Sequence, residues 1–384
     1  MKFLLKNILI TTILLVFIEI CAGLLLTPNR YNEIYGALRV DSDYMWKVTP
    51  NYEDLFFGAP LKTNKHGFRV NEGLSECEKR IGVFGASPSF GWGVENQYTY
   101  TNQLNEIYRS KGICFFNYSA IGYSSSQGRK LFSKMINKEN LDAVIVSYLV
   151  NDVDFNRFFF LSDKTDQKVL DNLGLLSLSF WMERLKESHS FKLVRQLMTK
   201  EISQEIQRNQ LEKSMGYVRV ESAEFIENLN SMLKLAQDKK IDFYYLEMPM
   251  GLMTITKYLK DKCAIRFQER FETETDFKEN IDDILLKLTQ CNTEEYSEIL
   301  KKNTDNKIDQ IRALVAMGRF EKNRNLLRKA WAKKNVPIIK VREQNMNDLK
   351  SSFLSRNYDF VHPSSLGHQM IAEDIVKELN LGLD

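Results

Sequence analysis

Four polar residues that lie far apart in the chain carry groups suited to catalysis: Ser87, Asn151, Asp359 and His362. Ser87 lies in "VFGASPSFGWGV", residues 83–94, where an apolar run ends abruptly in a turn of small residues. A serine on such a strand-to-helix turn can act as a nucleophile, because the turn exposes its hydroxyl at the edge of a sheet. Asp359 and His362, in "YDFVHPSSLGH", add a carboxylate and an imidazole three residues apart. A serine becomes a good nucleophile only when an oriented base takes its proton, so these residue types belong together.

Each of these residues also has a purely structural interpretation. Serine and glycine are common in ordinary strand-to-helix turns, so Ser87 needs no catalytic role to explain it. Asn151 and Asp152 could cap a helix or shape a turn, and Asp359 and His362 could form a structural hydrogen bond. Only the elements that position these residues can decide between the two interpretations.

Short apolar runs alternate with helical periodicity from residue 80 onward, which indicates a parallel sheet with helical crossovers. The expected strands are 80–85, 114–120, 141–150, 241–249 and 336–342, and the expected helices are 96–111, 125–137, 222–240, 323–335 and 364–379. Active sites of open parallel sheets form at the carboxyl ends of the strands. Ser87, Gly122 and Asn151 each follow a strand, and the Asp359–His362 pair follows the last one. We therefore expect these groups to meet at one edge.

Two long segments interrupt this alternation, at residues 155–221 and 251–320. Both are too long for plain loops and contain helical periodicity, so we expect helical insertions that form walls or a lid. The first opens with "FNRFFFLSD". Its Phe158, Phe159 and Phe160 either pack the insertion onto the core or line a substrate cleft. The expected organisation is an anchor at 1–29, an extended lead-in at 30–79 and a catalytic domain at 80–384.

The first thirty residues differ from the rest of the chain. Residues 8–26 are apolar except for Glu19, and as a helix they reach about 30 Å, the thickness of a bilayer core. No small-x-small cleavage site follows, which favours an uncleaved anchor over a signal peptide. Lys2 and Lys6 predict a cytoplasmic N-terminus and an exported body, although Arg30 weakens the charge asymmetry. Glu19 either faces a partner helix or extends to the outer interface.

Composition and cysteine content restrict the class of protein. The 384 residues are 43% hydrophobic and 27% charged, with 53 basic and 50 acidic residues mixed in sign, so nucleic-acid binding has no support. Histidines and cysteines are scattered, which predicts no metal, and no phosphate-binding glycine loop is present, so we expect no cofactor. Cys77 and Cys114 precede strands expected to be neighbours and could form a disulfide, as could Cys263 and Cys291, with free thiols as the alternative.

The chain resembles the SGNH (GDSL-like) hydrolase superfamily over about residues 60–384, apart from the insertions. "VFGASPSFGWGV", "NYSAIG", "LVND" and "DFVHPSSLGH" resemble the first, second, third and fifth blocks of the family, and "TNKHGFR" resembles the lead-in of exported, membrane-anchored members. The resemblance implies Ser87 as nucleophile, His362 as general base and Asp359 as its orienting partner. It also implies an oxyanion hole built from the Ser87 and Gly122 backbone amides and the Asn151 side chain. The expected fold is a flavodoxin-like, three-layer α/β/α sandwich with a five-stranded parallel sheet.

Two residues depart from the family pattern: Ala86 stands where the first block usually has aspartate, and Leu149 where the third block usually has glycine. The leading functional hypothesis is a membrane-anchored, extracytoplasmic esterase that removes acyl groups, O-acetyl above all, from a cell-surface carbohydrate. A polysaccharide O-acyltransferase would use the same residues. A non-catalytic module of an envelope assembly, bound to a protein partner, is the third hypothesis, and Ala86 and Glu19 favour it.

Overall fold

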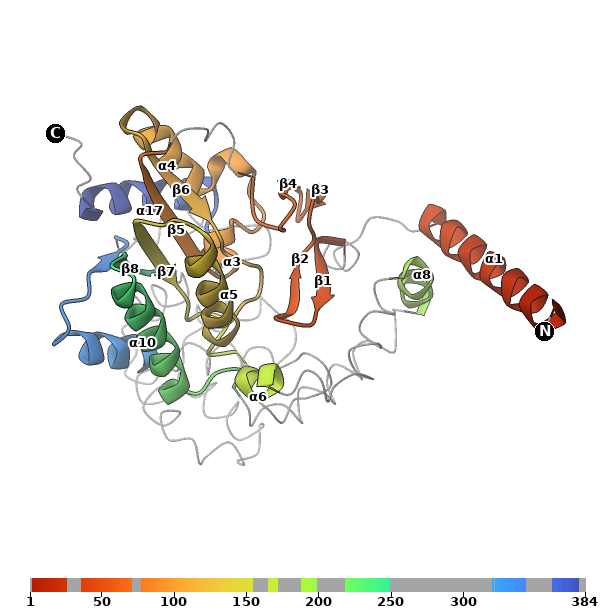
Figure 1. The fold of residues 1–384 in the computed structure, drawn as a ribbon. Helices are drawn as coiled ribbons and strands as arrows, with labels where there is room; N and C mark the ends of the chain where they lie inside the picture. The colour runs from red at the N-terminus through yellow and green to blue at the C-terminus, as the bar shows by residue number, and fades with distance from the viewer. Residues whose placement is uncertain are drawn as a thin grey trace, which may run out of the picture.

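The computed structural model describes residues 2–25, 36–70, 77–154, 165–171, 188–198, 218–248, 320, 322–342 and 361–379 (Figure 1). Its centre is a five-stranded sheet in the order β6-β5-β7-β8-β9, in which all neighbouring strands are parallel. The strands are β5 (Lys79–Gly85), β6 (Ile113–Asn117), β7 (Ala143–Ser147), β8 (Asp242–Glu247) and β9 (Ile338–Lys340). Counted along the chain, this is the 2-1-3-4-5 order of flavodoxin-like folds. The predicted fold class is therefore confirmed.

Helices cover both faces of the sheet, because alternate side chains of each buried strand point to opposite sides. On one face, Ile81 and Val83 of β5 pack in a cluster with α4 (Tyr100–Tyr108) and α17 (Ser365–Leu379). On the other face, Phe84 packs in a cluster with α5 (Ser125–Lys138) and α10 (Ser222–Asp238). A further helical stretch, residues 322–331, adds Trp331 to this second cluster. The two clusters fix the sheet between its helical layers.

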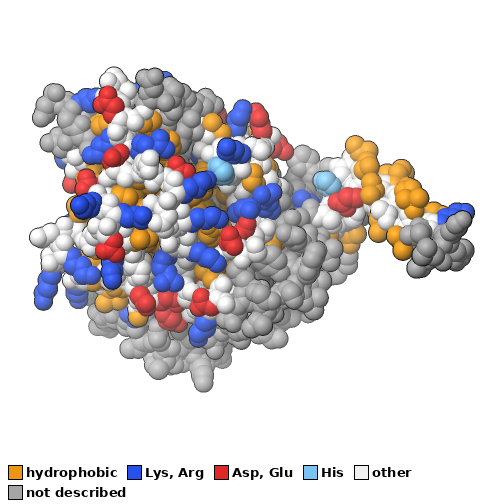
Figure 2. Space-filling view, viewed as in Figure 1, with side chains coloured by type: hydrophobic (Ala, Val, Ile, Leu, Met, Phe, Trp, Pro, Cys, Tyr) orange, Lys and Arg blue, Asp and Glu red, His pale blue; other side chains and the backbone are white. Residues whose placement is uncertain are grey.

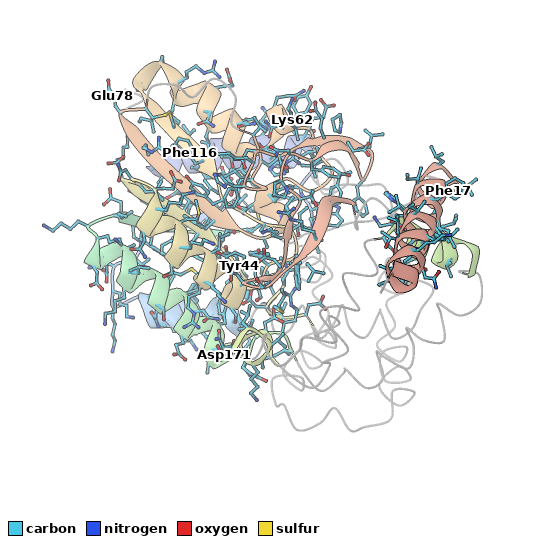
Figure 3. The ribbon with its side chains drawn as sticks, turned by 45° about the vertical axis from the view of Figure 1, so that its right-hand side comes forward. Phe17, Tyr44, Lys62, Glu78, Phe116 and Asp171 are labelled. Carbon is cyan, nitrogen blue, oxygen red and sulfur yellow. A yellow bond between two sulfur atoms is a disulfide. The ribbon has the colours of Figure 1, made fainter. Side chains whose placement is uncertain are left out.

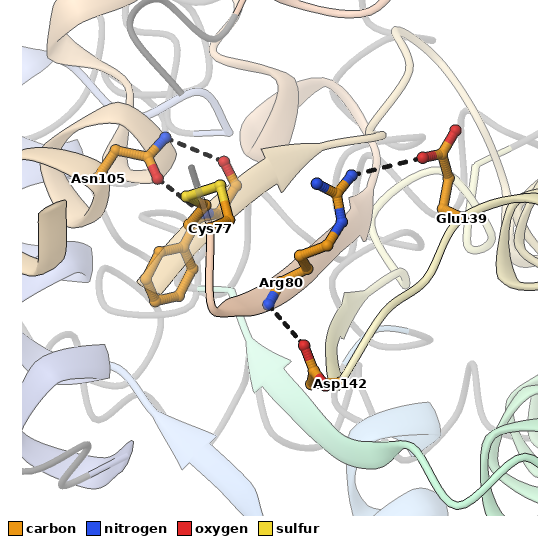
Figure 4. The surroundings of a disulfide bond; sticks show 7 residues. Cys77, Arg80, Asn105, Glu139 and Asp142 are labelled. Carbon is orange, nitrogen blue, oxygen red and sulfur yellow. Dashed lines mark hydrogen bonds and ion pairs between the residues drawn. A yellow bond between two sulfur atoms is a disulfide. The ribbon is translucent and has the colours of Figure 1, made fainter. Parts of the chain in front are cut away.

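A disulfide joins Cys77 to Cys114 at the amino ends of β5 and β6 (Figure 4). The register pairs Arg80 with Cys114, which brings the two strand starts side by side, as the sequence predicted. The predicted pairing is therefore present. Close by, the Arg80 N–H donates to Asp142 (2.7 Å), and Asn105 exchanges two hydrogen bonds with the Phe115 backbone, so polar contacts also hold this end of the sheet.

The lead-in is not an extended linker in its described part, residues 36–70. It forms two antiparallel hairpins, which lie between α1 and the sheet (Figure 1). The first hairpin joins β1 (Leu38–Asp41) to β2 (Met45–Val48), and the second joins β3 (Glu53–Phe56) to β4 (Ala59–Lys62). Phe56, Leu61 and Val48 are buried in a small apolar cluster with Phe90, from the short helix after β5, and Ile121, from the loop after β6. The hairpins are therefore packed onto the part of the body that carries Ser87 and Gly122.

Helix α1 (Lys2–Leu25) is long and apolar enough over Lys6–Leu25 to cross a membrane, by length and composition. Its apolar side chains are exposed, and Figure 2 shows them as a projecting orange cylinder beside a body of mixed charge. Phe17, labelled in Figure 3, belongs to this exposed surface. An unburied apolar helix of this length fits either a membrane anchor or a signal sequence.

Parts of the first insertion are described, and they include α6 (Asp166–Asp171) and α8 (His189–Met198). Helix α8 packs against α1, where the Glu19 carboxylate accepts hydrogen bonds from the His189 N–H and from the N–H and hydroxyl of Ser190. The predicted intramembrane acid thus meets a helix of the same chain. Residues 251–319, the Phe158–Phe160 cluster and both Cys263 and Cys291 lie outside the described residues.

Candidate active site

Ser87 begins helix α3 (Ser87–Phe90), directly after β5, at the carboxyl edge of the sheet. Pro88, as the second helical residue, suits a helix start because its missing N–H has no partner to lose there. The turn is tight: a Cβ on Gly85 would lie 2.5 Å from Ser89 Oγ and 2.9 Å from the Ser147 carbonyl oxygen of β7. Only glycine fits at that contact, so the sequence at the end of β5 fixes where the hydroxyl of Ser87 emerges.

His362 lies across from Ser87, and its Nε2 atom is 2.9 Å from Ser87 Oγ. This distance suits proton transfer between a serine and a base. The imidazole ring stacks on Trp92, with 4.8 Å between ring centroids and 14° between planes. The sequence separation of the serine and the histidine is 275 residues, so only the fold brings them together. Asp359 lies outside the described residues.

A second histidine, His368, is close to the site but is unsuited to act as a base. It is fully buried, and its Nδ1 atom accepts a hydrogen bond from the Tyr100 N–H (3.2 Å). Burial, with help from the positive charge of Arg69 and from His362, lowers the pKa of His368 to about 3. His368 is therefore neutral at physiological pH and acts as a packed core residue.

The backbone amides of Ser87 and Gly122 and the side chain of Asn151 lie at the ends of three adjacent strands. Within the described residues, neither the Ser87 N–H nor the Gly122 N–H has a hydrogen-bond acceptor. Gly122 has φ of 74°, a value that side chains disfavour, so the direction of its N–H depends on glycine. Asn151 Nδ2 donates to the Tyr123 carbonyl oxygen (3.0 Å), which ties the third loop to the second. An amide nitrogen has two hydrogens, so the second remains for a ligand.

A buried arginine of the first insertion holds the loop of Gly122. Arg219 donates to the Gly122 carbonyl oxygen (2.8 Å), to Gln127 Oε1 (2.8 Å) and, through two nitrogens, to Asp166 Oδ2 (3.0 and 2.8 Å). The side chains of Arg219 and Asp166 are 2% and 1% exposed. Arg219 and Asp166, both from the first insertion, therefore hold the Gly122 loop, a contact that sequence reasoning missed because no local pattern pairs two residues so far apart.

The hairpins of the lead-in contact the same loops. Trp46 of β2 donates from Nε1 to the Ile121 carbonyl oxygen (2.9 Å) and accepts at its own carbonyl from the Tyr123 hydroxyl (2.8 Å). Gln127 Nε2 donates to the carbonyl of Tyr44 (2.7 Å), a residue labelled in Figure 3. The lead-in therefore belongs to the site, whereas the sequence predicted only a connection to the anchor.

Arg69 is the arginine of "TNKHGFR", and it is 2% exposed. It donates to the carbonyl oxygens of Phe90, Gly91 and Val94, the last two through the same nitrogen. Burial lowers its pKa to about 9, so it stays charged at neutral pH. The motif that resembled an exported lead-in therefore holds the turn and loop that follow Ser87.

Asp152, next to Asn151, is completely buried. Its Oδ1 atom accepts from the Ser125 N–H (2.9 Å), while Oδ2 has no hydrogen-bond partner in the part of the chain that the structure describes. Burial raises the pKa of Asp152 to about 7, against the lowering effects of Ser125 and Arg219. The residue is thus part of the buried polar network beside the Gly122 loop, with a carboxyl group that titrates near neutral pH.

A small pocket of about 20 Å³ adjoins the site, and its lining includes Ala86, Pro88, Leu149, Val150 and Val361. In the sequence, Ala86 and Pro88 flank Ser87. The residues Leu149 and Val150 precede Asn151, and Val361 precedes His362. Both departures from the family pattern, Ala86 and Leu149, thus face one pocket, where they replace a carboxylate and a glycine by apolar groups. A space of about 10–15 Å³ holds one water-sized group, so this pocket accepts little more than a methyl group.

Among the described residues, no group of three or more histidine, cysteine or acidic side chains could hold a metal ion.

No family model matches the sequence, and no curated protein matches it either. Solved structures do match in fold. TesA is 11% identical, over 79% of this chain and 98% of its own, with a TM-score of 0.39. A GDSL-like lipase from Bacteroides thetaiotaomicron is 11% identical over 80% of this chain and 90% of its own, with a TM-score of 0.38. A catalytic mutant of an acetylxylan esterase from Geobacillus stearothermophilus is 11% identical over 79% of this chain and 95% of its own, with a TM-score of 0.39. At these values, the function of this chain has to be inferred from its own residues.

Proposed function

We propose that the chain is a serine esterase of the SGNH type. The observation that carries the proposal is the 2.9 Å approach of Ser87 Oγ and His362 Nε2 at the carboxyl edge of the sheet. In the proposed mechanism, Ser87 Oγ attacks the ester carbonyl carbon while His362 takes its proton, and the imidazolium then protonates the departing alcohol. Water repeats the sequence on the acyl-serine and releases the acid. Asp359 is proposed as the group that orients His362.

The tetrahedral intermediate places a negative charge on the former carbonyl oxygen. We assign its stabilisation to the N–H groups of Ser87 and Gly122 and to Asn151 Nδ2. The unpartnered state of the two backbone donors supports this assignment, because donors that are fixed before the reaction lose nothing to reorganisation. One such donor typically lowers the barrier by about 3 kcal/mol.

A short acyl group is the best-supported substrate. The small pocket lined by Ala86 and Leu149 also includes the charged side chains of Glu247 and Arg324, and its size suits an acetyl methyl rather than a longer chain. We propose O-acetyl esters of a cell-surface carbohydrate as the substrates, with α1 as a membrane anchor and the body exported. The Cys77–Cys114 disulfide supports export, because such bonds persist in oxidising compartments.

The test uses the full chain in detergent. Ser87 should be labelled by a fluorophosphonate, and p-nitrophenyl acetate should be hydrolysed by the protein but not by Ser87→Ala or His362→Ala, since loss of either group costs several orders of magnitude. The exposed Ser133 and His66 supply control variants, Ser133→Ala and His66→Ala, which should keep full activity. Full activity of Ser87→Ala would rule out the proposal.

The acyl preference has its own test. The rate should fall steeply from acetyl to butyryl esters, and Leu149→Ala should recover butyryl hydrolysis by enlarging the pocket. Acetylated glycans, followed by acetate release and by sugar mass, would show whether water or a sugar hydroxyl receives the acyl group. Equal rates on acetyl and octanoyl esters would contradict the assignment of the pocket.

A further inference from the structure

The base of the site, His362, rests on an aromatic stack that reaches into the lead-in. Its ring stacks on Trp92 at 4.8 Å, and Trp92 in turn contacts Phe57 at 4.3 Å and Phe56 at 4.7 Å between ring centroids. Trp92 and Phe57 are half-buried, whereas Phe56 is 1% exposed. The near-parallel geometry of the first pair, with 14° between planes, fixes the plane of the imidazole.

Two further contacts fix Trp92 itself. Its N–H donates to the carbonyl oxygen of Ser87 (3.1 Å), so the tryptophan and the nucleophile share one turn. Arg69 donates to the carbonyl oxygens on either side of Trp92, those of Gly91 and Val94. The nucleophile and the support of its base are therefore parts of one clamped loop.

The backbone of the second hairpin points to the same role. Phe57 and Gly58 connect β3 to β4 with φ values of 53° and 78°, the two positive values that a tight hairpin turn of this kind requires. Asparagine or glycine usually takes the first of these positions, and a bulky side chain there is strained. Phe57 is kept at this unfavourable position, and its ring lies on Trp92. The turn thus presents a ring to the stack at a conformational cost.

We propose that Trp92 is a positioning residue for His362, and that Phe57 fixes Trp92 from the lead-in. This inference rests on the proposed esterase function. The face of an indole ring attracts a positive charge, so the stack also suits an imidazole that becomes an imidazolium during acyl transfer. A stack of this kind holds the ring plane without competing for its nitrogen atoms.

The test measures kcat and KM on p-nitrophenyl acetate, and thermal unfolding, with the full chain in detergent. Trp92→Leu should lower kcat by about 10- to 100-fold with little change in KM, because a misplaced base slows the chemistry rather than binding. Trp92→Phe should restore most of kcat, since it keeps an aromatic face. A rise in KM with kcat unchanged would overturn the proposal and make Trp92 a substrate contact.

Phe57→Gly separates positioning from folding. The glycine relieves the strained backbone, so Tm should be kept or raised, yet kcat should fall severalfold because the ring is gone. Lys240→Gly is the matched control: Lys240 also has a positive φ, 58°, but lies in the turn between α10 and β8, and its variant should keep kcat. Unchanged kcat in Phe57→Gly would exclude the role of Phe57.

A thermodynamic cycle tests the stack without catalysis. Because the rings of Trp92 and His362 are in contact, the losses of Tm in Trp92→Leu and His362→Ala should not add in the double variant. Additive losses would contradict the stack. An inactive wild-type protein with a non-additive cycle would refute the esterase proposal and leave the stack in place, so the two failures are distinguishable.

Discussion

On the proposed oxyanion side of Ser87, near Gly122, a buried ion pair holds the loop at the strand ends, whereas on the proposed base side, near His362, aromatic rings do. Arg219 and Asp166 fix the Gly122 loop through its carbonyl oxygen, and both side chains are almost fully buried. His362 lies on Trp92, with Phe57 behind it. The two supports also come from different parts of the chain, the first insertion and the lead-in.

This difference matches the charge that each side receives in the proposed reaction. The oxyanion side receives a negative charge, and the guanidinium held beside the Gly122 loop has the opposite sign. The base side receives a positive charge, and an aromatic face tolerates it where a second cation would repel it. Arg69 is close to the base side, but its donors point at backbone carbonyls.

The largest expected effect is on the oxyanion side. Arg219→Met should lower the free energy of unfolding by about 3–5 kcal/mol, because it removes the guanidinium that is ion-paired with the buried Asp166 carboxylate. The double variant Arg219→Met/Asp166→Leu should recover most of that stability but keep a low kcat, since the Gly122 carbonyl still lacks its donor. Urea unfolding and esterase kinetics measure the two quantities.

The control for this pair is on the surface. Arg109 binds Glu106 (2.7 Å), and the two side chains are 50% and 69% exposed. Arg109→Met should therefore cost at most about 1 kcal/mol and leave kcat unchanged. An equal loss of unfolding free energy in the two arginine variants would show that burial of the ion pair does not determine its contribution to stability.

Asn151→Ala should lower kcat by about 10²–10³ with little change in KM, because its amide acts on developing charge. Steady-state kinetics on p-nitrophenyl acetate check this. Asn105→Ala, which removes two hydrogen bonds to Phe115 away from the site, should lower Tm without a comparable loss of kcat. A change in KM alone would make Asn151 a binding residue.

Asp152 predicts a pH dependence of stability. Its pKa is raised by burial from the ordinary value near 4 to about 7, so its favourable contribution is complete below pH 4 and is lost as the pH rises to about 7. The positive charge of Arg219 lowers the pKa of Asp152, whereas the negative charge of Asp166 raises it. Asp152→Asn should remain neutral throughout, so its Tm relative to wild type should rise between pH 4 and pH 8. A constant difference in thermal scans would contradict the assignment.

The smallest effect concerns one hydrogen bond. Trp46→Phe removes the donor to the Ile121 carbonyl and should cost about 1 kcal/mol of stability, with a severalfold loss of kcat because the oxyanion loop loosens. Trp331→Phe removes a comparable bond to Asn230 of α10, in the helical layer rather than at the strand ends that carry Ser87 and Gly122. It should affect stability alone, as thermal unfolding and kinetics would show.

Much of the fold could be predicted because the signals were local. Continuous apolar runs such as 141–150 marked the buried strands, and small residues marked their ends. The meeting of Ser87 with His362 followed from strand-end geometry, and the Cys77–Cys114 pair from neighbouring strand starts. These steps needed only the topology of a parallel sheet.

The supports of the site could not be predicted in the same way. Arg219, Arg69 and Trp46 act through backbone carbonyls, and a carbonyl contact has no sequence pattern because every residue supplies one. Phe57 is recognisable only from its positive φ. The roles of Asp359 and of Phe158, Phe159 and Phe160 stay predictions, since these residues lie outside the described part of the chain.

The position of the disulfide separates the lifetime of the protein from its rate of turnover. Cys77 and Cys114 close a loop with a sequence separation of 37 residues, which disfavours the unfolded chain by about 4 kcal/mol on the chain-entropy estimate. The bond lies at the amino ends of β5 and β6, whereas Ser87 and Gly122 lie beyond their carboxyl ends. In an oxidising compartment, this bond stabilises the chain against unfolding and proteolysis, and it takes no part in the proposed ester hydrolysis. Its reduction would shorten survival long before it slowed a single catalytic cycle.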